Sequence, residues 1–182
     1  AQIEALLGEL AARDTAAAEN AARAQARAAM AQINAALGTG DPFQAAIDAL
    51  SGVIDAPVPA ELAAAAADGV PTLAALQTGV ADAARDALAA ARSDGAENAG
   101  VFGFVERQLG LRSVAPRAGD DPDAVLSRVE AAARSGDLTT ALSEAEALPD
   151  VAKAAMADWL TAAQTRRDAV EAADALNARL SG

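Results

Sequence analysis

Alanine is the feature that most limits what this chain can fold into. It makes up nearly a third of the 182 residues, whereas aromatic residues make up 2% and there is no tyrosine. Sheets are built largely from β-branched and aromatic side chains, and alanine is the strongest helix former. The composition therefore predicts an all-α fold, which we expect to be a helical bundle of hairpins with a long N-terminal helix of the coiled-coil type.

Residues that the chain lacks exclude several common kinds of functional site. There is no histidine and no cysteine, so an imidazole base, a thiolate nucleophile and the usual zinc ligands are all absent. The formal net charge of −12 opposes binding to the phosphate backbone of nucleic acids. We therefore expect a protein that is not an enzyme, has no cofactor and does not bind nucleic acid.

Residues 1–38 predict a coiled-coil helix that ends near Gly38. Ile3, Leu7 and Leu10 begin an apolar pattern with alternating steps of four and three residues, which is typical of a coiled-coil seam. The pattern skips one position and continues on Ala17, Ala21, Ala24, Ala28, Ala31 and Ala35. Alanine lets two helices approach closely but buries little area, so this helix needs a partner. We expect Ile3, Leu7 and Leu10 to lie in an interface of a homo-oligomer.

The remaining sequence predicts shorter helices in two regions, 39–96 and 97–182. In the first, Asp41 and Pro42 are suited to capping and starting a helix, and a later helix starts at Pro71 and stops at residues 93–95. In the second, Asp121-Pro122 begins a helix, Gly136-Asp137 separates it from the next, and a final helix runs from Pro149-Asp150 to Leu180.

Trp159 is the only tryptophan, and it continues a four-three pattern with Met156 along the final helix. A large aromatic side chain among alanines fills the space that they leave, which favours a role in core packing. The same seam position is compatible with an oligomer interface, and we include Met156 and Trp159 in that prediction.

Residues 97–117 combine apolar and positively charged side chains. Two of the three phenylalanines lie here, and no acidic residue occurs between Glu106 and Asp120. An amphipathic basic helix is attracted to an anionic bilayer surface, although an interface between helices would also use such a segment. The predicted lipid-binding residues are Phe102, Phe104, Arg107, Leu111, Arg112 and Arg117.

Several motifs in the last region resemble the C-terminal domain of the mitofilin family. They are Leu109-Gly-Leu111-Arg112-Ser-Val114, the segment 119–130, Gly136-Asp137-Leu138 with Ala141 and Leu142, and Ala157-Asp158-Trp159-Leu160. Their order and spacing are similar to the family over roughly residues 97–180. The alanine- and arginine-rich composition, with a single lysine, resembles an alphaproteobacterial member more than a mitochondrial one.

The resemblance implies the large subunit of the mitochondrial contact site and cristae organising system, or its bacterial homologue. Such a protein is anchored in the inner membrane by an N-terminal helix, and this domain lies in the periplasm, or in the intermembrane space if mitochondrial. The family shapes membranes, binds lipid just before the mitofilin domain and self-associates. The implied partners are a second copy of the chain, an anionic membrane surface and another envelope or membrane-organising protein.

Two functions of different classes follow. The first is a membrane-shaping scaffold that self-associates and organises cristae or intracytoplasmic membranes through the segment 97–117. The alternative is a soluble adaptor in which the helical hairpins around Asp137 to Leu148 form a groove for a partner's helix, without lipid contact. A plain coiled-coil spacer fits residues 1–37 and leaves the remainder unexplained.

Overall fold

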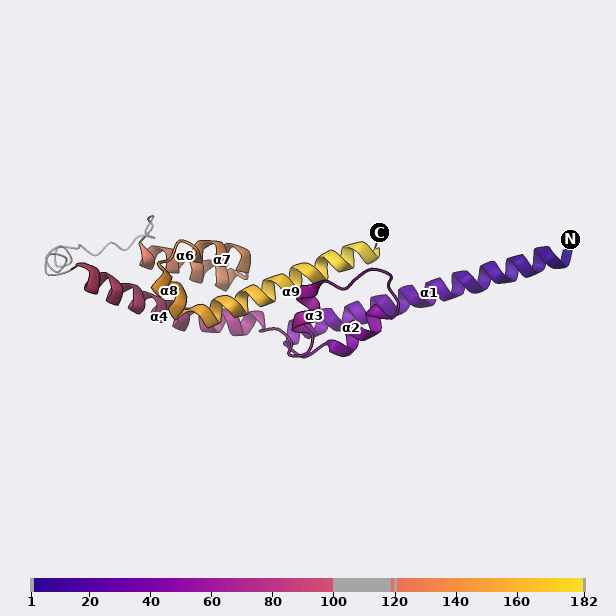
Figure 1. Cartoon of the computed structure of the whole chain (residues 1–182), viewed down its shortest axis with the longest axis horizontal. Coiled ribbons are helices and arrows are strands. Elements are labelled where there is room, and N and C mark those ends of the chain that lie inside the picture. The colour runs from indigo at the N-terminus through magenta and orange to yellow at the C-terminus, as the bar shows by residue number, and fades with distance from the viewer. Residues whose placement is uncertain (1, 100–118, 120, 182) are drawn as a thin grey trace. The chain divides into compact units, whose positions relative to one another are not determined.

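The computed structural model describes residues 2–99, 119 and 121–181, and these residues form helices and connecting turns without strands (Figure 1). The all-α prediction is confirmed, as is the long N-terminal helix, α1 (Gln2–Thr39). The other described helices are α2 (Gln44–Ser51), α3 (Ala60–Ala65), α4 (Leu73–Ala99), α6 (Pro122–Ser135), α7 (Leu138–Ala145), α8 (Asp150–Ala155) and α9 (Ala157–Ser181).

The described residues divide into two compact units. Unit 1 contains residues 2–70 and 168–181, and unit 2 contains residues 71–99, 119 and 121–167. This division differs from the expected boundaries after residues 38 and 96, because residues 39–70 pack with α1. Helix α9 contributes its first part to unit 2 and its last part to unit 1.

The core of unit 1 is formed by the C-terminal half of α1, by α2 and α3, and by the end of α9. Ile33, Leu50, Leu62 and Leu176 are fully buried in it. Burial of each such side chain stabilises the fold by roughly 1.5–3 kcal/mol. These four large side chains therefore contribute more to the stability of unit 1 than the many alanines around them.

The turn after α1 differs from the prediction. The Asp41 carboxylate accepts a hydrogen bond from the Thr39 hydroxyl at 2.7 Å and does not cap the next helix. Helix α2 begins at Gln44 after Phe43, which is buried and whose backbone N–H donates to the Ala66 carbonyl at 2.8 Å. Burial of the Phe43 side chain thus decides where this helix starts.

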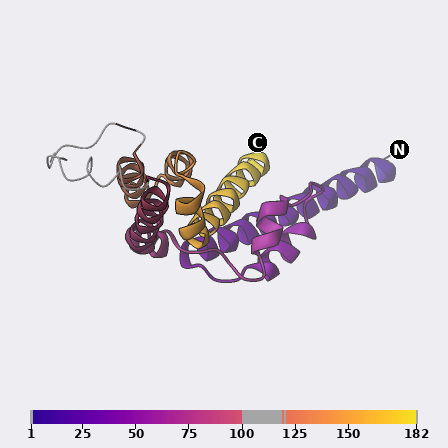
Figure 2. The ribbon, with the colours of Figure 1, turned by 60° about the vertical axis from the view of Figure 1, so that its left-hand side comes forward.

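Unit 2 packs α4 against α6 and α8, and α6 against α7; Figure 2 shows α4, α6 and α7 side by side and nearly end-on. Its core includes Val80, Val125, Val129 and Met156.

Two helix boundaries differ from the prediction. Helix α4 continues through residues 93–95, because one interior glycine costs a helix only about 1 kcal/mol. The expected final helix is interrupted at Met156, between α8 and α9.

The caps of α6 and α7 form as the sequence indicates. Asp121 accepts a hydrogen bond from the Asp123 backbone N–H at 3.1 Å. Asp137 accepts from the backbone N–H of Thr140 at 2.9 Å and from its hydroxyl at 2.7 Å. These bonds, first the backbone one and then the hydroxyl one, lower the pKa of Asp137, because they stabilise the charged carboxylate.

Replacing Asp137 by alanine is expected to lower the urea midpoint of unfolding at neutral pH. Because the folded-state pKa is depressed, the ionised cap stabilises fully above the unfolded-state pKa of about 3.9. This contribution is lost as the pH falls through the folded-state value. The midpoints of wild type and Asp137→Ala should therefore converge in acid. Asp68→Ala, at an exposed aspartate outside any cap, is the control. A difference between wild type and Asp137→Ala that stays constant down to the lowest pH would contradict the cap.

Candidate interaction surfaces

The N-terminal half of α1 exposes an apolar surface. Every residue from 2 to 21 is exposed, and the stretch extends beyond the other helices of unit 1 (Figure 1). Ile3, Leu6, Leu7 and Leu10 are 74, 63, 61 and 56% exposed. We call these four residues the N-terminal stripe. Exposed leucines are common singly, whereas a contiguous group is typical of an interaction site.

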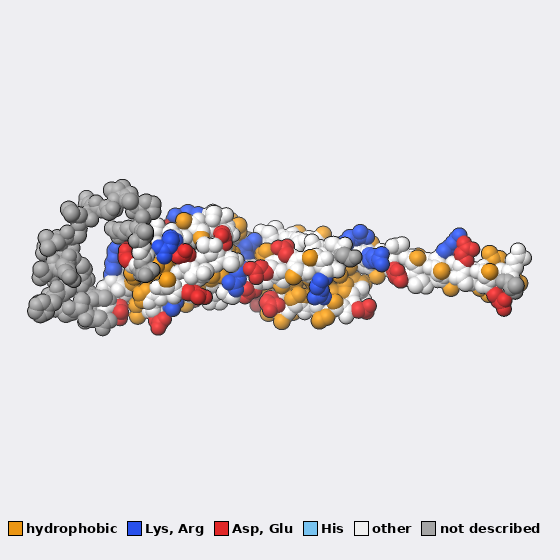
Figure 3. All heavy atoms as spheres, turned by 90° about the horizontal axis from the view of Figure 1, so that it is seen from above, with side chains coloured by type: hydrophobic (Ala, Val, Ile, Leu, Met, Phe, Trp, Pro, Cys, Tyr) orange, Lys and Arg blue, Asp and Glu red, His pale blue; other side chains and the backbone are white. Residues whose placement is uncertain are grey.

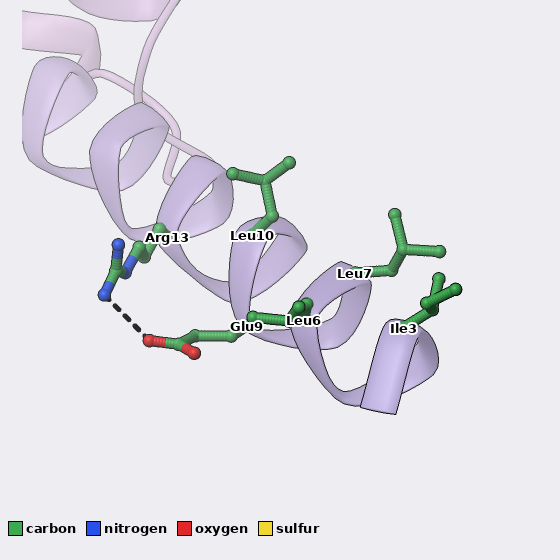
Figure 4. Close-up of a pocket in the computed structure, with 6 residues that line it drawn as sticks. All are labelled: Ile3, Leu6, Leu7, Glu9, Leu10 and Arg13. Carbon is green, nitrogen blue, oxygen red and sulfur yellow. Dashed lines mark hydrogen bonds and ion pairs between the residues drawn. The ribbon is translucent and has the colours of Figure 1, made fainter. Parts of the chain in front are cut away.

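Leu6 and Leu7 are adjacent in the sequence, and each lies about one helical turn from Ile3 and from Leu10, so the four side chains share one side of the helix. Figure 4 shows Ile3, Leu7 and Leu10 extending to the same side. Glu9 and Arg13 border it and form an ion pair of 2.7 Å. Figure 3 shows hydrophobic side chains along this narrow part of the molecule. Leu6 was not part of the predicted seam, because a strict four-three alternation passes over it. Its spacing of three residues from Ile3 and four from Leu10 was the signal that could have identified it.

The predicted seam is exposed along the whole of α1. Its first members, Ile3, Leu7 and Leu10, belong to the stripe, and its alanines at positions 17, 21, 24, 28, 31 and 35 are all exposed. The face that packs into unit 1 is a different one, formed by Ala26, Ala29, Met30, Ile33, Ala36 and Leu37. Larger side chains bury more area than alanine, so Met30, Ile33 and Leu37 determine which face packs. As a result, the seam remains open to a second helix.

Met156 and Trp159 do not lie on an open surface. They are 2% and 7% exposed in the core of unit 2. The Trp159 indole N–H donates to the backbone carbonyl of Leu76 at 3.0 Å, as buried tryptophans usually require. The expectation of an oligomer interface at these two residues is therefore corrected, because unit 2 itself already covers their surfaces. The interpretation of Trp159 as a core residue agrees with the structure.

Unit 2 contains a groove of about 480 Å³ beside α7. Leu142 and Leu160 give it an apolar part, and Glu146, Lys153 and Arg167 give it charged ones. It lies on the helical hairpin for which the sequence suggested a partner-binding groove. A groove with this mixture of side chains can accept an amphipathic helix.

The predicted lipid-binding residues, Phe102, Phe104, Arg107, Leu111, Arg112 and Arg117, lie outside the described residues. Within residues 2–99, 119 and 121–181, no three acidic side chains come together as a set of metal ligands. None of the described helices combines the length and the apolarity that crossing a bilayer requires. The described residues present the N-terminal stripe, the seam of α1 and the groove beside α7 as candidate surfaces for association.

Comparisons with known proteins add no relative. No family model matches the sequence, and neither a curated protein nor a solved structure matches it.

Proposed function

We propose that the chain is a non-enzymatic scaffold that self-associates through α1 and contacts anionic inner-membrane lipid through the segment 97–117. In this role it organises cristae or intracytoplasmic membranes, as the resemblance to the mitofilin family implies. The observation that supports self-association is the seam of α1, whose residues from Ile3 to Ala35 are exposed. The opposite face of the helix is the one that packs into the core of unit 1. A second chain can therefore bind without opening the core of unit 1.

The N-terminal stripe supplies most of the expected association energy. Transfer of a leucine or isoleucine side chain from water stabilises by roughly 1.5–3 kcal/mol, and each chain offers four such side chains. The alanines that continue the seam add little area but let the helix backbones approach closely. Association should therefore depend strongly on the stripe and weakly on any single alanine.

Self-association strengthens a weak lipid contact. A single interfacial segment with few cations binds a bilayer reversibly, and each arginine near an anionic surface contributes about 1 kcal/mol. Linking several copies of the segment 97–117 raises their effective concentration and increases avidity by ~10²–10⁴. Membrane shaping by this chain thus requires both the seam and the segment.

A pair of substitutions tests the seam. Leu7→Glu with Leu10→Glu places charge in the stripe, and we expect the wild-type oligomer to become a monomer in sedimentation equilibrium. Binding to anionic vesicles should fall at least tenfold through lost avidity. The control, Ala5→Glu with Ala12→Glu, adds the same charge to exposed positions of α1 outside the stripe and should retain the wild-type mass. A wild type that is monomeric at all concentrations, or an oligomer insensitive to the stripe variant, would refute self-association through α1.

A second variant tests the lipid contact. Changing Arg107, Arg112 and Arg117 together to Glu should abolish co-sedimentation with anionic vesicles and leave the oligomeric mass unchanged. Neutral vesicles should bind neither protein. Salt-insensitive binding of wild type and variant alike would contradict an electrostatic contact at this segment.

The alternative function, a soluble adaptor, is favoured by the groove beside α7. Its mixed lining of Leu142, Leu160 and charged side chains suits an amphipathic helix of a protein partner. The vesicle experiment separates the two functions. If the chain is an adaptor, the wild type should bind neither anionic nor neutral vesicles, even as an oligomer.

A further inference from the structure

Unit 1 contains a second groove, which we call the arginine groove. It has a volume of about 730 Å³ and lies between α1, the connection from α2 to α3, and the end of α9. The residues that line it are Ala22, Arg23, Ala26, Arg27, Val53, Ile54, Asp55, Ala56, Arg179, Leu180 and Ser181.

The charge of this groove is opposite to that of the whole chain. Three arginines line it against one acid, Asp55, whereas the chain as a whole carries −12. Arg23 makes one loose ion pair, with Glu19 at 3.9 Å. Arg27 and Arg179 form no ion pair with any part of the chain that the structure describes. The groove therefore holds uncompensated positive charge.

Helix stability explains only part of the arrangement of the arginines. Glu19 and Arg23 form a favourable i,i+4 pair on α1. Arg23 and Arg27 are four residues apart on α1, where like charges repel each other. Arg179 lies in the last turn of α9 and there complements the helix dipole, but the two arginines of α1 lie in the middle of their helix. An anion shared by the three guanidinium groups would relieve the repulsion.

The floor of the groove is apolar and incompletely covered. Val53, Ile54 and Leu180 are each only half-buried where they pack against the core of unit 1. A free inorganic anion would satisfy the arginines and leave this floor in water. A neutral apolar molecule would cover the floor and leave the arginines without a partner. The two features together match a ligand with an anionic head and an apolar chain.

We propose that the arginine groove binds one molecule of an anionic amphiphile, with a phosphate or carboxylate head on Arg23, Arg27 and Arg179 and its chain on Val53, Ile54 and Leu180. Guanidinium groups pair with phosphate and carboxylate through two parallel hydrogen bonds. The volume lies within the range of about 300–1,000 Å³ that is usual for small-molecule sites. This site shares no residue with the segment 97–117 and does not depend on the proposed function.

Calorimetric titration of the full chain tests the site with three ligands. They are dihexanoyl phosphatidic acid below its micelle concentration, dihexanoyl phosphatidylcholine and inorganic phosphate. We expect the phosphatidic acid to bind at least tenfold more tightly than either of the others. Equal affinity for inorganic phosphate would overturn the role of the floor, and equal affinity for phosphatidylcholine would overturn the role of the arginines. Binding of phosphatidic acid only in vesicles would identify a membrane surface as the ligand and overturn the single-molecule site.

Substitutions test whether phosphatidic acid binds in the arginine groove. Arg27→Glu with Arg179→Glu should weaken phosphatidic acid binding at least tenfold, and both side chains are exposed, so the fold is retained. The control with matched charge is Arg85→Glu with Arg92→Glu, two exposed arginines of α4, and it should bind as the wild type does. Ile54→Ser should lower the affinity for phosphatidic acid without changing the affinity for inorganic phosphate. Unchanged binding in the Arg27 and Arg179 variant, or no binding by the wild type, refutes the proposal.

Discussion

Replacing Trp159 by alanine is expected to lower the free energy of unfolding by about 3–5 kcal/mol, the usual effect of removing a buried aromatic side chain. The indole is 7% exposed in a core that otherwise contains many alanines. It lies over Gly79, where an added Cβ would be 3.8 Å from its Cδ1 atom. Urea unfolding followed by far-ultraviolet circular dichroism measures the loss.

Trp159→Phe separates the packing of the ring from its hydrogen bond. Phenylalanine retains most of the apolar area but cannot donate to the Leu76 carbonyl. Because a hydrogen bond of this kind contributes about 0.5–1.5 kcal/mol, Trp159→Phe should be much milder than Trp159→Ala. If Trp159→Ala changes the oligomeric mass and leaves the unfolding free energy unaltered, Trp159 is an interface residue and its assignment to the core is wrong.

Gly69→Ala is expected to destabilise unit 1 by about 2–5 kcal/mol. Gly69 has φ +77°, and a Cβ there would lie 2.2 Å from the backbone oxygen of Gly40 and 2.9 Å from the carbonyl carbon of Asp41. A non-glycine residue in this conformation costs about 1–2 kcal/mol, and forcing atoms into a packed site typically costs 1–3 kcal/mol more. Both contacts are backbone atoms, so no side-chain rotation relieves them. Thermal and urea unfolding measure the effect.

Gly38→Ala is the matched control for this substitution. Gly38 lies in the last turn of α1, an added Cβ meets nothing within 4 Å, and its φ is not positive. Alanine there should be neutral, or should stabilise by up to about 1 kcal/mol through the lower entropy of the unfolded chain. Equal stabilities of Gly69→Ala and Gly38→Ala would contradict the close approach of the two turns.

Local features were predicted well from the sequence, because their causes are local. The all-α class follows from alanine content, and the caps at Asp121 and Asp137 need only neighbouring residues. The packing face of α1 depends on contacts with α2, α3 and α9, which its own periodicity does not contain. Arg166, which interrupts the apolar pattern of α9, donates to the Pro71 carbonyl at 2.9 Å. A partner so distant along the chain leaves no sequence signal.

The two candidate sites differ in the same way. The seam was visible because its residues recur along one helix. The arginine groove was not, since Arg23, Ile54 and Arg179 come together only through the fold. The predicted segment 97–117 remains a prediction that the vesicle experiment addresses.

The path of α9 sets an order in which the chain can mature on the ribosome. Unit 2 is one continuous stretch, 71–167, and can close once that stretch has emerged. Unit 1 takes Ala169, Ala173 and Leu176 from the end of α9, so the core to which residues 2–70 contribute is completed only after α9 has been translated. At about 5–20 residues per second, translation from Val70 to Leu176 takes roughly 5–20 seconds, and during that time the core of unit 1 lacks the side chains of α9. Until α9 arrives, the part of this core that α9 covers is exposed on the nascent chain, where a second nascent chain can contact it.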